Sequence, residues 1–252
     1  MGAKTALLAF SDGDLREALR GARPADAAAA EGLVREMYPE YEVTPAETSN
    51  LFDGVNPPDD VTFALVLPGA ELLADWRLVL EPTADLPEEL LARGAGRRVV
   101  MHHMHSVTDS LCFAVWEDGV LVRSLSLSPD DGIDVNIGEP YEFERPFWAG
   151  EHPVLPEPGW PDRPPYPLPF HPLELGEEAL RALFGFVLEG RPHPDNVDPF
   201  EVPMHAFHTV DPTGAEQTGR DALYEMVRTQ MLRPRQFKLG PDGKMHEFEP
   251  PN

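Results

Sequence analysis

The sequence predicts a single α+β (or α/β) domain in which flanking helices cover a mostly antiparallel sheet. Three strand-like runs follow one another at residues 97–105, 110–117 and 119–128. The last two are joined by Asp118-Gly119, a dipeptide typical of the tight hairpin turns that connect antiparallel strands. Apolar residues at helical spacing elsewhere indicate helices that can pack on such a sheet. A chain of 252 residues is long enough to bury a substantial core.

The N-terminal part predicts a strand, a broken helix and another strand. Residues 4–10 form a short apolar run that ends in the turn signal Ser-Asp-Gly-Asp. Residues 14–38 are rich in helix formers, with a break near Gly21 and Pro24. A short strand in YEVTPAE precedes a more strongly apolar one at residues 61–69, which ends in Pro-Gly.

The middle of the chain predicts short helices, an irregular strand and a longer helix. Residues 70–96 contain two short helical pieces, ELLADWRLVL and LPEELLARG. The alternation of the strand at 119–128 slips near Arg123, which indicates a β-bulge or burial on both faces. Residues 174–189 carry apolar side chains at i, i+3, i+4 and i+7, and Gly190 is a fitting end for this helix.

The expected domain covers residues 1–212 and closes with a strand at 200–210. It includes a proline-rich belt at 152–172, which holds nine prolines and cannot donate regular ladder hydrogen bonds. Aromatic residues within the belt predict that it wraps around the domain. Residues 213–252 predict a C-terminal helix followed by a polar tail.

Composition excludes several classes of function. The 44 acidic and 20 basic residues give a formal charge of -24, which repels phosphate backbones and anionic lipid. Nucleic acid and membranes are therefore not expected partners, whereas a protein or a small molecule fits. The single cysteine, the missing signal-peptide pattern and the lack of a long apolar stretch predict a cytoplasmic protein.

Histidines at the start of the strand cluster are the first candidate site. On a strand His103 and His105 share one face, so they could place two imidazoles on a transition metal. A third ligand could come from Asp109, His152, Glu144 or His208, and Asp109 or Glu144 could also act as an acid–base group. The catalytic candidates are His103, His105, Asp109 and Glu144, and the first two of these are the metal candidates. The opposing interpretation is that strand histidines are packed and hydrogen-bonded, which predicts no cofactor.

Nucleophilic catalysis finds less support in the same region. Ser106 lies beside His105 and near Asp109, but the chain has no G-x-S-x-G elbow, so a turn between strands explains these residues. Cys112 lies inside an apolar strand and is most simply a small buried side chain.

A second cluster of candidates follows at residues 139–148. Glu142 and Glu144 share a face of an extended segment and could divide acid and base roles, but in a chain with so many acids a solvated edge is the favoured explanation. Arg123, Arg145 and Trp148 are the candidate ligand-binding residues. An arginine inside an apolar strand needs a carboxylate partner or an anionic ligand, and for Arg123 we favour a structural ion pair.

Three long strings carry a resemblance to a known family. They are the opening MGAKTALLAF, then MHSVTDSLCFAVWEDGVLVRSLSLSPDDGIDVNIGEPYEFERPFWAGEH at 104–152, and YPLPFHPLELGEEALRALFGFVLEGRP at 166–192. With these strings the chain resembles a family of actinobacterial proteins known only as a domain of unknown function. The resemblance spans about residues 1–210. It implies a bacterial cytoplasmic setting and a single domain, and it assigns no catalytic residues.

Three functional hypotheses follow. The leading one is a non-enzymatic binding or interaction module for a protein or a small molecule, because none of the catalytic motifs is complete. The second is a metal-dependent or carboxylate-based hydrolase centred on the strand His102–His105. The third is a structural homo-oligomer, of which a homodimer is the simplest form.

Overall fold

The computed structural model describes residues 2–22, 26–78, 88–155, 165–231, 236–239 and 245–248. The chain divides into two compact units, Met1–Val210 and Asp211–Asn252. Within the described residues no helix is both long and apolar enough to cross a bilayer.

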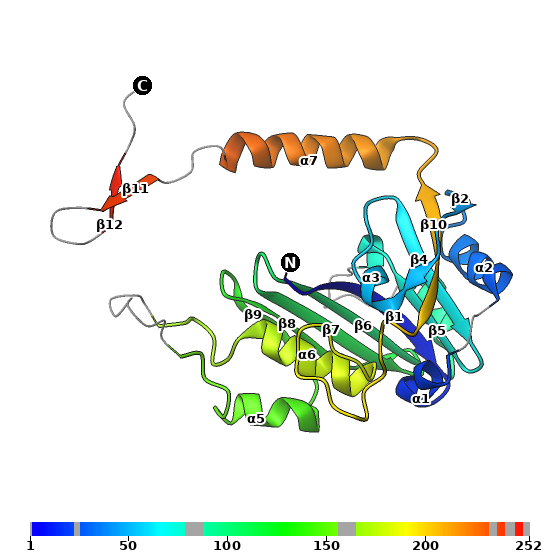
Figure 1. Ribbon diagram of the computed structural model, residues 1–252, viewed down its shortest axis with the longest axis horizontal. Helices are drawn as coiled ribbons and strands as arrows, with labels where there is room; N and C mark the ends of the chain where they lie inside the picture. The colour runs from blue at the N-terminus through cyan, green and yellow to red at the C-terminus, as the bar shows by residue number, and fades with distance from the viewer. Residues whose placement is uncertain are drawn as a thin grey trace. The chain divides into compact units, whose positions relative to one another are not determined.

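The first unit is built on one large antiparallel sheet (Figure 1). Its strands are β1 (Lys4–Ser11), β2 (Glu42–Pro45), β3 (Ser49–Asn50), β4 (Val61–Leu67), β5 (Ala70–Ala74), β6 (Arg98–His105), β7 (Ser110–Glu117), β8 (Val120–Ser128), β9 (Gly132–Ile137) and β10 (Pro203–Val210). Their order is β2-β10-β4-β5-β1-β6-β7-β8-β9, with β3 beside β10. The pairs along this path are antiparallel, which confirms the predicted α+β class.

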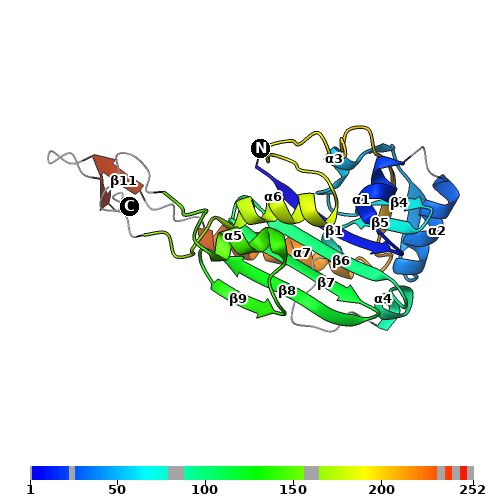
Figure 2. The same ribbon diagram turned by 90° about the horizontal axis from the view of Figure 1, so that it is seen from below.

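Helices cover both faces of the sheet (Figures 1 and 2). They are α1 (Leu15–Arg20), α2 (Ala27–Met37), α3 (Leu51–Gly54), α4 (Glu88–Arg93), α5 (Arg145–Trp148) and α6 (Pro172–Leu183), with the 3-10 turns η1 (Trp76–Leu78) and η2 (Glu142–Glu144). Side chains of α1, α3, α5 and α6 join the core on one face. Those of α2 and α4 join a separate core on the other. The sheet is thus buried on both sides by apolar packing.

The strand cluster forms as predicted. Asp118 and Gly119 both have positive φ, 51° and 76°, which is the conformation of a type I′ hairpin turn. In the pairing of β7 with β8, Val115 lies opposite Arg123 and the next pair is Trp116 with Leu121. One residue of β8 is therefore extra at this point. The predicted slip near Arg123 is confirmed as a β-bulge.

The helical prediction for the start of residues 70–96 is wrong. Ala70–Ala74 is strand β5, which pairs with both β1 and β4 in the middle of the sheet. Leu72 belongs to one core and Leu73 to the other. Because both faces of β5 are buried, residues 72–74 form an apolar run without the alternation that would mark a strand. The helix in the later LPEELLARG piece is confirmed as α4.

Helix α6 is shorter than the pattern at 174–189 predicts. It ends at Leu183, and Gly185 takes a left-handed φ of 86°. The Gly185 N–H donates to the carbonyls of Leu180 and Arg181, which closes the helix end. Gly190 is therefore not the cap. The apolar spacing continues past the helix because the following residues are also buried against the core.

The proline-rich belt is described only in part, since residues 156–164 lie outside the described residues. At its C-terminal end Leu168 and Phe170 are 6% and 0% exposed and belong to the same core as α6. This end of the belt is thus packed on the first unit.

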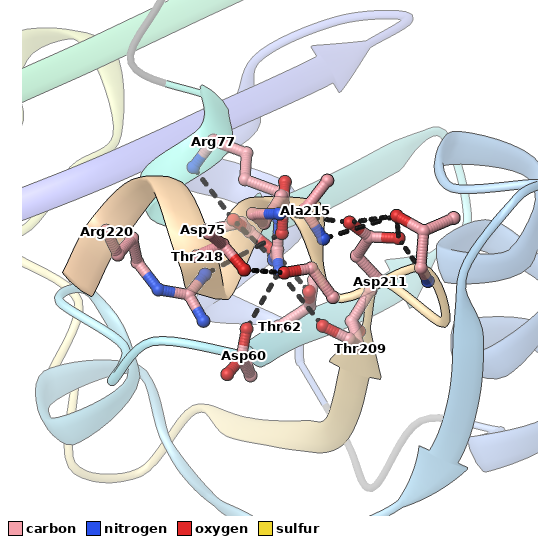
Figure 3. Close-up of polar contacts among 12 residues, drawn as sticks. Asp60, Thr62, Asp75, Arg77, Thr209, Asp211, Ala215, Thr218 and Arg220 are labelled. Atoms are coloured by element: carbon pink, nitrogen blue, oxygen red, sulfur yellow. Dashed lines mark hydrogen bonds and ion pairs between the residues drawn. The ribbon is translucent and has the colours of Figure 1, made fainter. Parts of the chain in front are cut away.

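A buried ion pair fixes η1 to the neighbouring strands (Figure 3). The Asp75 carboxylate is fully buried and accepts hydrogen bonds from the Thr62 hydroxyl and from the Arg77 backbone N–H and guanidinium. Arg77 Nη2 also donates to the Thr209 carbonyl at 2.9 Å. Burial raises the pKa of Asp75 despite the neighbouring Arg77 charge. The pair joins the ends of β4, β5 and β10.

The second unit contains α7 (Ala215–Met231) and a hairpin of β11 (Gln236–Leu239) and β12 (Met245–Phe248). The helix is predicted by the sequence, whereas the hairpin is not. Asp211 precedes α7, and its carboxylate accepts from the Thr213 hydroxyl at 2.7 Å and the Glu216 N–H at 3.0 Å. These hydrogen bonds lower the pKa of Asp211.

Candidate functional site

A pocket of about 250 Å³ lies in the first unit where β1 ends and β6 begins. Its polar lining comes from three elements. Ser11 is the last residue of β1 and pairs with Arg98, the first residue of β6. Asp14 is the N-cap of α1, and Arg16 lies in the first turn of this helix. The antiparallel register of β1 and β6 therefore sets the two strand residues side by side.

The rest of the lining is apolar. It comes from Leu15 of α1, Val100 of β6, and Ala182 and Leu183 in the last turn of α6. In both views the C-terminal end of α6 lies beside α1 (Figures 1 and 2). A side-chain Cβ at Gly185 would lie 2.6 Å from Arg16 Cγ, so only glycine allows this approach. The pocket thus combines an apolar wall with a polar, charged one.

The acidic groups near the pocket are held by arginines. Asp14 accepts from Arg16 Nη2 at 2.7 Å and from the Arg16 backbone N–H at 2.9 Å, and the side-chain hydrogen bond lowers the pKa of Asp14. Asp12, in the adjoining turn, pairs with Arg97 at 2.7 Å. On their own, the two acids of this turn would repel an anion, but their arginine partners neutralise them.

Arg98 is the least engaged cation of the pocket. Its Nη2 makes a long hydrogen bond of 3.4 Å to the Tyr141 hydroxyl, and its Nε lies 4.0 Å from Glu117 Oε1. Nε is buried and donates to no acceptor among the described residues. The Arg98 side chain is 38% exposed, so solvent and ligands can reach it.

Most of the sequence matches one family. The match is to the model described as Family of unknown function (DUF6928), and it covers residues 5–207. The chain belongs to the DUF6928 family. No curated protein and no solved structure matches it. The matched span of this DUF6928 chain includes every residue that lines the pocket.

The central histidine of the predicted strand, His102, is fully buried in the DUF6928 core. Its Nε2 donates to the Gly176 carbonyl of α6 at 3.1 Å, so its Nδ1 accepts from the Thr5 hydroxyl at 2.8 Å. The Thr5 oxygen in turn accepts from the Met104 N–H at 2.9 Å. Burial lowers the pKa of His102 to about 3. This imidazole is a neutral, structural link between the sheet and α6.

The two metal candidates lie on the opposite face of β6, as the alternation predicts. The rings of His103 and His105 are 6.4 Å apart, and His103 Nδ1 donates to the Thr5 carbonyl at 2.7 Å. Burial lowers the pKa of both histidines. Among the described residues no group of three His, Cys, Asp or Glu side chains is placed to hold a metal ion.

Asp109 faces a histidine that the sequence did not associate with it. Asp109 Oδ2 lies 3.7 Å from Nε2 of His171, the N-cap of α6, and His171 Nδ1 accepts from the Leu173 N–H at 3.3 Å. Only the Nδ1 contact is within hydrogen-bond range, whereas the contact of Nε2 with Asp109 is longer. The pair orients the start of α6 over the β6–β7 turn.

Glu144 is brought together with two of the candidate ligand-binding residues. Its carboxylate accepts from Arg123 Nε at 2.9 Å and Nη2, from the Tyr141 N–H at 2.9 Å, and from Trp148 Nε1 at 3.3 Å. The side chains of Arg123 and Glu144 are both fully buried. This is the structural ion pair that the sequence favoured for Arg123, whereas Arg145 is exposed.

Cys112 is buried in β7, and burial raises the pKa of its thiol to about 12. A thiol with so high a pKa is not ionised near neutral pH and is a poor nucleophile. The interpretation of Cys112 as a small buried side chain fits this environment.

The sequence did not lead us to the pocket residues, although a pair of arginines pointed to this end of the sheet. Arg97 and Arg98 open a strand in a strongly acidic chain, and the rule applied to Arg123 holds equally for them. The rule calls for a carboxylate partner or an anionic ligand. Arg97 has carboxylate partners in Asp12 and Glu71, whereas the one carboxylate near Arg98 among the described residues is Glu117, at 4.0 Å.

Changing Gly185 to alanine should lower the free energy of unfolding by about 1 to 2 kcal/mol, because alanine is strained at positive φ. The new Cβ would also push against Arg16 and loosen the wall of the pocket. The matched control is Gly21→Ala, since Gly21 has a φ of -88° and its nearest atom is 3.6 Å away. Urea unfolding of both variants checks this, and equal losses in the two would contradict it.

Proposed function

We propose that this DUF6928 protein is a non-enzymatic binding module that holds a small organic molecule in the pocket between β1, α1, β6 and α6. The observation that carries the proposal is the composition of the lining, which joins an apolar wall to a small number of convergent polar groups. This combination is typical of ligand pockets. A cytoplasmic setting suits the single buried thiol of Cys112.

The size of the pocket limits its ligand. Its volume of about 250 Å³ lies below the range of pockets for drug-sized molecules. It equals the liquid volume of about eight waters, which suits a ligand of roughly eight to ten non-hydrogen atoms. Ligands of this size bind with a Kd of roughly 10 µM to 1 mM.

The surroundings of the catalytic candidates favour binding over the hydrolase alternative. Among these candidates, His103 donates from Nδ1 to the Thr5 carbonyl, and Glu144 accepts from several donors while it neutralises Arg123. An acid–base group needs a lone pair or proton within reach of a substrate. The pocket, in contrast, has Arg98 in its lining, and the hydrogen bond of this arginine to the Tyr141 hydroxyl is long, at 3.4 Å.

A screen of small fragments with the full chain tests the proposal. Ligand-observed NMR should find compounds of about eight to ten heavy atoms that bind the wild type. The variant Ala182→Phe, which fills the pocket from the last turn of α6, should lose them. Ala29→Phe on the exposed face of α2 is the matched control and should retain them. Fragments that bind Ala182→Phe as well as the wild type would place the binding elsewhere and overturn the proposal.

A further inference from the structure

We infer that the ligand of this pocket is a small monocarboxylate with an apolar body, and that Arg98 binds its carboxylate group. The inference rests on the proposed function, because it names the chemical class of the ligand for the same pocket. Its first support is the unused capacity of Arg98. A guanidinium has five N–H donors in a planar fork that matches a carboxylate, and toward the residues that the structure describes Arg98 donates only from Nη2, over 3.4 Å.

Other arginines of the first unit show how such a group is normally satisfied. Arg123 donates to Glu144, Asn136 and two backbone carbonyls. Arg97 donates to Asp12 and Glu71. Within the described part of the chain Arg98 has one carboxylate neighbour, Glu117, at 4.0 Å, and the Glu117 side chain is 58% exposed. An exposed pair at this distance contributes little, so a ligand carboxylate can compete with it.

The charge of the pocket also favours an anion. Its charged lining residues are Asp14, Arg16 and Arg98, and the first two neutralise each other in a close pair. Arg98 therefore leaves a net positive charge in the lining, on a chain whose formal charge is -24. Such a chain repels anions from most of its surface. A pocket with a local positive charge is therefore a favoured place for an anion to bind.

The apolar wall decides between kinds of anion. Leu15, Val100 and Leu183 line the pocket and are themselves buried, so they offer contact to a hydrocarbon group and no hydrogen bonds from their side chains. A phosphate or sulfate ion would leave this wall without a partner. A carboxylate attached to a ring or a branched chain satisfies both walls within about ten heavy atoms.

The test uses benzoate and benzamide, which have the same shape and differ in charge. Calorimetric titration of the full chain should give benzoate a Kd at least about ten-fold lower than benzamide, because a hydrogen bond to a charged group is stronger. Arg98→Gln should raise the Kd of benzoate to that of benzamide and leave benzamide unchanged. Arg35→Gln on α2, where Arg35 pairs with Glu31 on the surface, should change neither.

The outcomes separate this inference from the proposed function. Benzamide that binds as tightly as benzoate, or benzoate that shows no binding at about 10 mM, overturns the carboxylate class. If fragments still bind the wild type but not Ala182→Phe, the pocket remains a binding site and only the class is wrong. If inorganic phosphate binds as tightly as benzoate, the inference that the ligand has an apolar body is wrong. If Arg98→Gln fails to fold, the comparison of benzoate with benzamide on the wild type still decides whether the ligand is a carboxylate.

Discussion

Replacing Glu144 with glutamine should lower the free energy of unfolding by about 3 to 5 kcal/mol, the range expected when one partner of a buried ion pair is removed. The Glu144 carboxylate is fully buried and neutralises Arg123, which is also fully buried. In the variant the guanidinium would stay in the core without a counter-charge. The neighbouring Trp148 and the Tyr141 N–H would share one remaining carbonyl oxygen.

Urea unfolding measures this loss, and Glu142→Gln on the same turn is the matched control because Glu142 is exposed. The double variant Arg123→Met, Glu144→Leu should recover part of the stability, since it removes both charges together. A loss of less than about 1 kcal/mol in Glu144→Gln would mean that the pair is not desolvated, against its place in the structure.

Acid should destabilise the protein through His102. The pKa of His102 is about 3 in the folded protein, and an unfolded histidine has a pKa of about 6.5. The unfolded chain therefore binds the proton first. The contribution of neutral His102 to the free energy of unfolding is complete above a pH of about 6.5 and is lost as the pH falls toward 3. Between about pH 7.5 and pH 5 this group alone should lower the free energy of unfolding by about 2 kcal/mol.

The variant His102→Gln tests this, because the amide stays neutral and can still reach Thr5 and Gly176. It should be less stable than the wild type at neutral pH, with a weaker dependence on pH below about 6.5. His193→Gln is the control, because the His193 side chain is 62% exposed. This variant should show the same dependence of the free energy of unfolding on pH as the wild type. If His102→Gln loses stability with acid as steeply as the wild type, His102 is not the group that takes up the proton.

Local signals were enough to predict much of the fold. The Asp118-Gly119 turn and the slip near Arg123 depend on a few neighbouring residues, and both were read correctly. Strand β5 was misread because burial on two faces erases the alternation that a sequence shows. Strand β9 was missed because its Asp-Asp-Gly start reads as a turn, and its place in the sheet depends on pairing with β8.

The pocket could not be predicted from local sequence patterns, because its lining is brought together by tertiary contacts. The turn with Ser11 and Asp14 lies far in the sequence from Arg98 and Leu183, and these segments meet only because β1 pairs with β6 while α6 ends beside α1. The ion pair of Arg123 was predicted in kind, but its partner was not, since Glu144 was assigned to acid–base chemistry. A charged residue in an apolar strand thus indicates that a partner exists, whereas the tertiary structure decides which one.

The most direct test of the account is a methyl-resolved NMR titration of the wild type with a fragment that binds. If the pocket is the binding site, we expect saturable shifts of the methyl signals of Leu15, Val100 and Leu183, all of which line it. The same shifts should be absent in Ala182→Phe. Shifts that saturate at methyl groups outside the pocket, with these three unchanged, would contradict the assignment of the pocket as the binding site.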